Sequence, residues 1–158
     1  MLKEAPKTKL KTVNHIGIPV SDLDRSLEFY TKLTGQEPMF VEPMYGPGLA
    51  NGANVPDAEV RFAMIQIDNT VLELLEYTQP KGKPFNQNNN DVGSIHIAFT
   101  VEDIDAVYED LKSKGVEFNA PPHKFTEADG APDVIGAKFA YLKDPDGIQL
   151  ELNQPASS

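Results

Sequence analysis

Two histidines and two glutamates are the residues of this sequence best suited to hold a cation. His15 and His96 each stand at the start of an apolar run, 81 residues apart, and Glu73 and Glu151 each stand inside a later apolar run, 78 residues apart. Two imidazoles with two carboxylates suit Zn, Ni, Co, Mn or Fe(II) better than Ca, which prefers oxygen ligands alone. Four such ligands in an octahedral shell would leave two positions for water or substrate.

One sequence pattern occurs twice and relates these residues to each other. Residues 13–24 read VNHIGIPVSDLD and residues 94–105 read SIHIAFTVEDID. At the offset of 81 residues the two histidines coincide, as do Val20 with Val101 and Asp22 with Asp103. Self-similarity at a fixed spacing indicates duplicated structure, and this spacing is too long for a solenoid. We therefore predict two copies of one module.

Each copy is predicted to contain a strand, a helix and three further strands, from hydrophobic periodicity and turn residues. In the first copy the strands are Val13–Val20, Met39–Glu42, Val60–Ile67 and Val71–Tyr77, the helix runs from Ser21 to Gly35, and Pro43–Ala58 is a long loop. In the second copy the strands are Ile95–Val101, Val116–Asn119, Ala137–Leu142 and Ile148–Leu152, the helix is Asp103–Lys114, and Pro121–Ile135 is a long loop.

The predicted organisation is one domain of residues 13–154 behind a flexible N-terminal tail of residues 1–12. Module one covers 13–78, a low-complexity linker covers 79–92, and module two covers 93–154. A module of this size would be marginally stable alone, so we expect the two to share a mixed sheet.

The alternation of side chains along the strands places the four candidate ligands on one face. In Val71–Tyr77 the apolar residues that match the helix leave Glu73 pointing to the other side, and the same alternation applies to His15, His96 and Glu151. A lone inward histidine is more often a core residue, and a lone strand glutamate is more often solvated. The joint, repeat-related placement favours a divalent cation, because unpaired buried carboxylates are costly.

Other polar residues are weaker candidates. In the alternation along its strand, Glu76 falls on the same face as the helix-facing leucines. Arg25 lies in the first predicted helix and is expected to form a surface ion pair. His123 has no counterpart in the repeat and is interpreted as a surface histidine. Tyr45 and the two long loops are candidates for covering a substrate, with ordinary variable loops as the alternative.

Composition excludes several classes of partner. The chain has 24 acidic and 14 basic residues, a formal charge of −10 and no cysteine. A nucleic-acid or anionic membrane partner needs a basic face, and no run approaches the ~20 apolar residues of a membrane span. The N-terminus lacks the apolar core of a signal peptide, and the absence of cysteine excludes disulfides and thiolate ligands. We expect a soluble, cytoplasmic protein that acts on a small molecule.

The sequence resembles the vicinal oxygen chelate superfamily, which includes glyoxalase I, methylmalonyl-CoA epimerase, extradiol dioxygenases and metal-free bleomycin-resistance proteins. The resemblance rests on the two histidine segments, on residues 24–30 (DRSLEFY), on residues 71–76 (VLELLE) and on residues 144–152 (DPDGIQLEL). It implies an α+β fold in which two βαβββ modules form a curved, cup-shaped mixed sheet. It further implies a homodimer.

The resemblance also implies which residues act. His15, Glu73, His96 and Glu151 match the metal-ligand positions, in a set similar to that of bacterial glyoxalase I. A metal-dependent isomerase or lyase of the glyoxalase–epimerase type is therefore expected, with a proton removed next to a metal-chelated oxygen, Glu151 as the preferred base and Glu73 as its partner. The alternatives are a non-haem Fe(II) extradiol-type dioxygenase, which usually has three ligands, and a metal-free binding protein.

The sequence departs from glyoxalase I after Glu73, where residues 74–78 read LLEYT, and it contains no tryptophan. Only Arg25 and Arg61 could clamp the anionic part of glutathione or CoA. The sequence therefore does not predict glutathione as a co-substrate.

Overall fold

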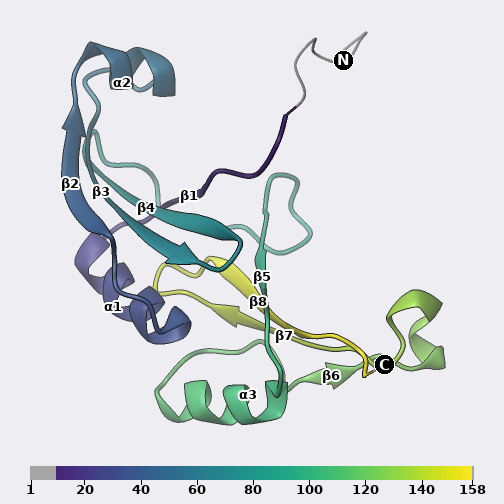
Figure 1. The fold of residues 1–158 in the computed structure, drawn as a ribbon. Coiled ribbons are helices and arrows are strands. Elements are labelled where there is room, and N and C mark those ends of the chain that lie inside the picture. The colour runs from purple at the N-terminus through teal and green to yellow at the C-terminus, as the bar shows by residue number, and fades with distance from the viewer. Residues whose placement is uncertain (1–9, 158) are drawn as a thin grey trace, which may run out of the picture. The chain divides into compact units, whose positions relative to one another are not determined.

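A computed structural model describes residues 10–157 of the chain (Figure 1). Most of the predicted N-terminal tail, residues 1–9, lies outside the described residues, as does residue 158. Along the chain, the structure contains two series of strands and helices that repeat the same order.

The first series forms a four-stranded mixed sheet with strand order β1-β4-β3-β2. Strand β1 pairs with β4 in parallel, whereas β4 with β3 and β3 with β2 are antiparallel. The elements are β1 (Ile16–Pro19), α1 (Leu23–Thr34), β2 (Phe40–Tyr45), α2 (Pro47–Ala53), β3 (Glu59–Ile67) and β4 (Thr70–Gln79).

The second series forms a separate four-stranded sheet of the same topology, with order β5-β8-β7-β6. Its one parallel pair is again the first strand with the last, β5 with β8. The elements are β5 (Ile97–Thr100), α3 (Ile104–Ser113), β6 (His123–Lys124), the 3₁₀ turns η1 (Glu127–Asp129) and η2 (Pro132–Val134), β7 (Lys138–Lys143) and β8 (Gln149–Gln154). Two βαβββ modules with open mixed sheets confirm the predicted α+β fold class. The expectation that the modules share one sheet is wrong, because the described strands form two four-stranded sheets.

The contacts divide the chain into two compact units. One unit contains the residues up to Leu23 together with Tyr30–Lys81, and the other contains Asp24–Phe29 together with the chain from Gly82 onward. The boundaries inferred from the repeat, 13–78, 79–92 and 93–154, stay a prediction.

The strand register is the same in both sheets at the candidate site. Gly17 of β1 is the partner of Glu73 in β4, and Ala98 of β5 is the partner of Glu151 in β8. The alternate residues face the other way and are buried: Ala63, Ile65, Leu72 and Leu74 in one sheet, and Ala140, Leu142, Leu150 and Leu152 in the other. One face of each sheet is therefore core, and the glutamate lies on the opposite face.

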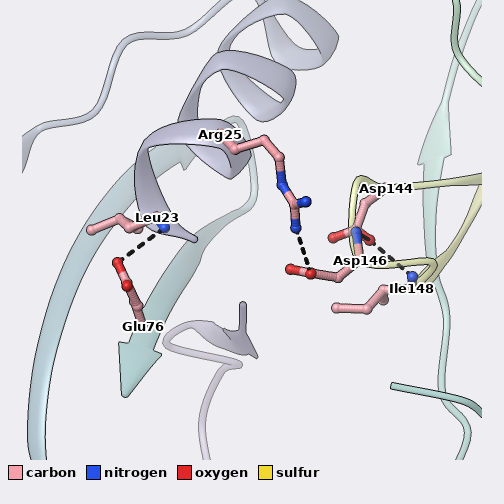
Figure 2. A network of polar contacts seen from close by, with 6 residues as sticks. All are labelled: Leu23, Arg25, Glu76, Asp144, Asp146 and Ile148. Atoms are coloured by element: carbon pink, nitrogen blue, oxygen red, sulfur yellow. Dashed lines mark hydrogen bonds and ion pairs between the residues drawn. The ribbon is translucent and has the colours of Figure 1, made fainter. Parts of the chain in front are cut away.

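Each module also caps its helix with a side chain from its last strand. The carboxylate Oε2 of Glu76 accepts the backbone N–H of Leu23 at 3.1 Å, as Figure 2 shows, and Oε1 of Gln154 accepts that of Ile104 at 2.9 Å. The first N–H groups of a helix have no acceptor within the helix. These contacts therefore satisfy donors that would otherwise lack a hydrogen-bond partner. Glu76 therefore stabilises α1 from the helix side of the sheet, in line with the prediction that it is a poor ligand candidate.

Three predicted segments differ from the structure. The predicted loop Pro43–Ala58 contains the end of β2 and the short helix α2, and the predicted loop Pro121–Ile135 contains β6, η1 and η2. The predicted strand Val116–Asn119 is wrong. That segment forms only an isolated bridge between Phe118 and Leu142, with backbone hydrogen bonds on either side of it.

Among residues 10–157, the structure contains no helix that is both long enough and apolar enough to span a membrane.

We predict that Glu76→Ala lowers the free energy of unfolding by about 1 kcal/mol, because α1 loses the acceptor at its N-terminus. Glu76→Gln keeps an acceptor oxygen and should lose less. Urea denaturation of the two variants measures the difference. Equal stability of wild type and Glu76→Ala would contradict this capping role.

Candidate functional site

His15 and Glu73, the two predicted ligands of the first module, contact each other near the N-terminal end of β1. His15 directly precedes this strand, and its Nε2 lies 3.3 Å from Oε2 of Glu73 in the neighbouring strand β4. The other ring nitrogen, Nδ1, lies 2.8 Å from Oδ1 of Asn14. The imidazole side chain is 40% exposed and the carboxylate side chain 12% exposed, so solvent reaches the pair from the histidine side.

The second predicted pair has the same construction. His96 directly precedes β5, and its Nε2 lies 3.0 Å from Oε2 of Glu151 in β8. The side chains are 41% and 12% exposed, nearly the values of the first pair. Duplicated strand register has therefore produced duplicated imidazole–carboxylate geometry.

The hydrogen bond to Asn14 bears on what the first pair can bind. When Nδ1 of His15 donates to the amide oxygen of Asn14, Nε2 carries a lone pair directed at the carboxylate of Glu73. Two acceptors that face each other are favourable only with a proton or a metal cation between them. A histidine that donates through one nitrogen and binds through the other is typical of metal ligands.

The two glutamates have different neighbours. Across the β7–β8 pair, Glu151 lies opposite Tyr141, whereas across the β3–β4 pair Glu73 lies opposite Met64. The Tyr141 hydroxyl donates a hydrogen bond to Glu151, and Nδ2 of Asn153 approaches Oε1 of Glu151 at 3.4 Å. Burial, and then the negative charge of Glu151, raises the pKa of Tyr141, so this hydroxyl stays protonated at neutral pH.

The structure thus brings the four predicted ligands together as two pairs. In the part of the chain that the structure describes, no group of three or more histidine, aspartate or glutamate side chains is arranged to hold a metal ion. A centre that uses all four residues stays a prediction.

His123, predicted to be a surface histidine, is solvent-exposed but has fixed neighbours. Its Nε2 lies 2.9 Å from Oδ1 of Asp129, and its ring contacts those of Phe125 and Phe139. Sequence reasoning missed this pair. The signal available for it was the Thr126–Asp129 spacing, which forms a capping box around η1.

Arg25 forms the ion pair that the sequence predicted. Its guanidinium lies 2.6 Å from Oδ1 of Asp146, in the turn between β7 and β8 (Figure 2). That turn is held by the buried carboxylate of Asp144, which accepts the N–H groups of Asp146 and Ile148 at 2.9 and 2.8 Å. Arg61 likewise approaches Glu76 at 3.5 Å, so both arginines lie against carboxylates.

Tyr45 lines an open cavity of about 620 Å³ beside α2, together with Pro47, Ala50, Asn51 and Gln79. None of the four predicted ligands lines this cavity. Its role as a cover for a substrate stays a prediction.

Residues 12–152 match the family model of the Glyoxalase/Bleomycin resistance protein/Dioxygenase superfamily. The chain belongs to this superfamily. The match covers both modules and confirms the resemblance seen in the repeated histidine segments.

Curated relatives and a solved structure agree with this assignment. The chain is 34% identical to a 2-epi-5-epi-valiolone epimerase of an Actinomyces species over 152 residues, which is 92% of this chain and 81% of the relative. It is 29% identical to the mitochondrial methylmalonyl-CoA epimerase of Mus musculus, over 96% of this chain and 78% of the relative. A glyoxalase family protein from Bacillus cereus has the same fold, with a TM-score of 0.82 at 20% identity over 98% of this chain and 100% of that one. Lactoylglutathione lyases are also among the matched relatives.

Proposed function

We propose that this protein is a metal-dependent epimerase that acts on a small molecule at a C–H bond next to a chelated oxygen. His15, Glu73, His96 and Glu151 would be the metal ligands. The observation that carries the proposal is the pair of repeat-related contacts, in which each histidine Nε2 faces a glutamate Oε2 at 3.0–3.3 Å.

The residues present fit a divalent transition metal. Two neutral imidazoles and two carboxylates are a donor set of mixed nitrogen and oxygen character, suited to Zn, Ni, Co, Mn or Fe(II). The carboxylates are largely buried, and a cation compensates their charge more fully than a neutral imidazole does. A bound ion would supply Lewis-acid polarisation of the substrate oxygens.

The two glutamates would exchange protons with the substrate carbon. Glu151, with its carboxylate positioned by the Tyr141 hydroxyl, takes the C–H proton onto a carboxylate oxygen. Glu73, which would enter the step as the protonated acid, delivers its own proton to the opposite face of the same carbon, which inverts the configuration and leaves Glu73 ionised and Glu151 protonated. Each transfer by a positioned side chain contributes roughly 10²–10⁴-fold to the rate.

The relatives support this class of reaction over its alternatives. Two of them are named as epimerases, of 2-epi-5-epi-valiolone and of methylmalonyl-CoA. An epimerase needs one acid–base group on each side of the carbon, and the duplicated glutamates supply two. Arg25 and Arg61 both approach carboxylates of this chain, which gives no support for a large anionic co-substrate such as glutathione.

The protein is also expected to form a homodimer, because each module presents an open sheet. Sedimentation equilibrium measures the mass of the particle in solution.

We predict that the purified protein binds one divalent transition metal ion per chain and that His15→Ala and His96→Ala each reduce the bound metal severely. The remaining ligands of an incomplete set bind far more weakly. Elemental analysis by mass spectrometry measures the metal content. His123→Ala is the matched control, because it removes the third histidine without touching either pair, and it should retain the metal.

Metal content unchanged in both ligand variants would contradict the assignment. A wild-type protein that takes up no added metal would favour a metal-free binding protein, and iron accompanied by oxygen uptake with a catechol would favour a dioxygenase.

We predict that the metal-loaded protein exchanges a substrate C–H for solvent deuterium with one member of a panel containing 2-epi-5-epi-valiolone and methylmalonyl-CoA. Glu151→Gln should slow this exchange by about 10²-fold or more, because its amide cannot accept the proton. Nuclear magnetic resonance in D₂O follows the exchange.

Glu76→Gln is the matched control, since this carboxylate lies on the helix side of β4 and should leave exchange intact. Unchanged exchange in Glu151→Gln with metal bound would show that Glu151 is not the base.

A further inference from the structure

A continuous row of aromatic rings lies on the same sheet face as Glu151. The register pairs Tyr141 with Glu151, Phe139 with Asn153, and His123 with Phe139. Residues opposite each other on neighbouring strands project to the same side of a sheet. The row, which we name the aromatic track, consists of Tyr141, Phe139, Phe125 and His123.

The rings contact one another along the whole track. His96 meets Tyr141 edge to face at a centroid distance of 5.1 Å, and Tyr141 meets Phe139 at 5.8 Å. Phe139 stacks on Phe125 at 4.9 Å and contacts His123 at 5.7 Å. The track therefore leads away from the His96–Glu151 pair and ends at a histidine.

The core does not account for this row. The alternate residues of β7 and β8, such as Ala140 and Leu152, are buried on the other face, where α3 packs. Lys138 also points to that side and pairs with Asp105 of α3. In contrast, Phe125, Phe139 and Tyr141 are only half-buried and His123 is exposed.

The histidine at the end of the track is held in one orientation. Oδ1 of Asp129 lies 2.9 Å from Nε2 of His123, while Oδ2 accepts the backbone N–H and the hydroxyl of Thr126 at 2.7 and 3.0 Å. The Thr126 backbone N–H holds the pKa of Asp129 below its usual value, so the carboxylate is ionised at neutral pH.

An ionised Asp129 requires Nε2 of His123 to carry the proton that it accepts. In the neutral ring Nδ1 is then a hydrogen-bond acceptor, and no described residue donates to it. An anionic group at this position would face both the lone pair and the Asp129 carboxylate, in a chain of formal charge −10. A hydroxyl group, which is neutral and can donate, fits the position best.

We propose that the aromatic track is the substrate-binding floor of this site, and that Nδ1 of His123 accepts a hydrogen bond from a hydroxyl at the far end of the substrate. This inference rests on the proposed function. The substrate class is an uncharged molecule with a flat apolar face, a pair of chelating oxygens at one end and a hydroxyl at the other. His123 is a binding and positioning residue here, not a catalytic one.

The described residues of the first module form no such track. The positions that correspond to Tyr141 and Phe139 in the β3–β4 pairing are Met64 and Phe62, opposite Glu73 and Leu75. Among residues 10–157, the ring of Phe62 contacts only that of Phe40, at a centroid distance of 5.6 Å, and no histidine ring extends this row. The duplicated glutamates therefore stand beside different surfaces, and the surface in the second unit can orient a substrate by hydrogen bonding.

Hydroxamates of increasing length test the proposal separately from the metal site, because each carries the same pair of chelating oxygens. The probes are acetohydroxamate, biphenyl-4-hydroxamate and its 4′-hydroxy and 4′-methoxy derivatives, titrated calorimetrically into the metal-loaded full chain. The biphenyl compound should bind about tenfold more tightly than acetohydroxamate through its contacts with the aromatic rings. The 4′-hydroxy compound should bind about fivefold more tightly than the 4′-methoxy compound, which cannot donate.

Variants assign these gains to residues. Phe139→Ala should remove most of the gain in affinity that the biphenyl group gives, and it should leave the dissociation constant of acetohydroxamate unchanged. Phe139→Leu keeps the apolar bulk and serves as the control for loss of folding. His123→Ala should abolish the preference for hydroxyl over methoxy. Lys124→Ala, the neighbour in β6 on the opposite face, is its matched control and should keep the preference.

The outcomes separate the two proposals. Failure of every hydroxamate to bind would overturn the metal site and the aromatic track with it. Binding of acetohydroxamate without any gain for the biphenyl compounds would overturn the track alone. A hydroxyl preference that survives in His123→Ala would overturn the role of that histidine.

Discussion

The charge of a largely buried carboxylate is the constraint on which each candidate half-site depends. Glu73 and Glu151 are each 12% exposed, and a carboxylate removed from water needs a positive or hydrogen-bonding partner. The parallel pairing of the first and last strands of each module supplies that partner, because it sets a histidine beside the glutamate. The same register that buries the leucines on one face thus determines the chemistry on the other.

The repeat gives two histidine–glutamate pairs of the same construction, and the residues around the two pairs differ. Glu151 receives a hydrogen bond from Tyr141, whereas Glu73 lies opposite Met64. A two-base inversion, in which one group removes a proton from one face of a carbon and another returns a proton to the opposite face, requires one ionised and one protonated group. The relatives of the chain include epimerases as well as lactoylglutathione lyases.

The sequence was most informative where periodicity and repetition act together. The alternation of side chains along the strands predicted each glutamate on the face opposite the core. The repeat predicted one histidine inside the first strand of each module, and in the structure each histidine instead directly precedes that strand. It was least informative where short elements depend on tertiary contacts, as in α2, which holds two glycines within seven residues, and β6, which is two residues long. The His123–Asp129 pair was missed because it depends on how a loop folds back, which no periodicity encodes.

X-ray absorption spectroscopy of the bound metal would show whether imidazoles from both modules bind one cation, as we propose. Multiple scattering from imidazole rings counts the histidine ligands without any knowledge of the substrate. We expect two imidazoles with oxygen ligands in the wild type, and one imidazole in a His96→Ala protein loaded with excess metal. A spectrum with a single imidazole in the wild type, or with oxygen ligands alone, would contradict it.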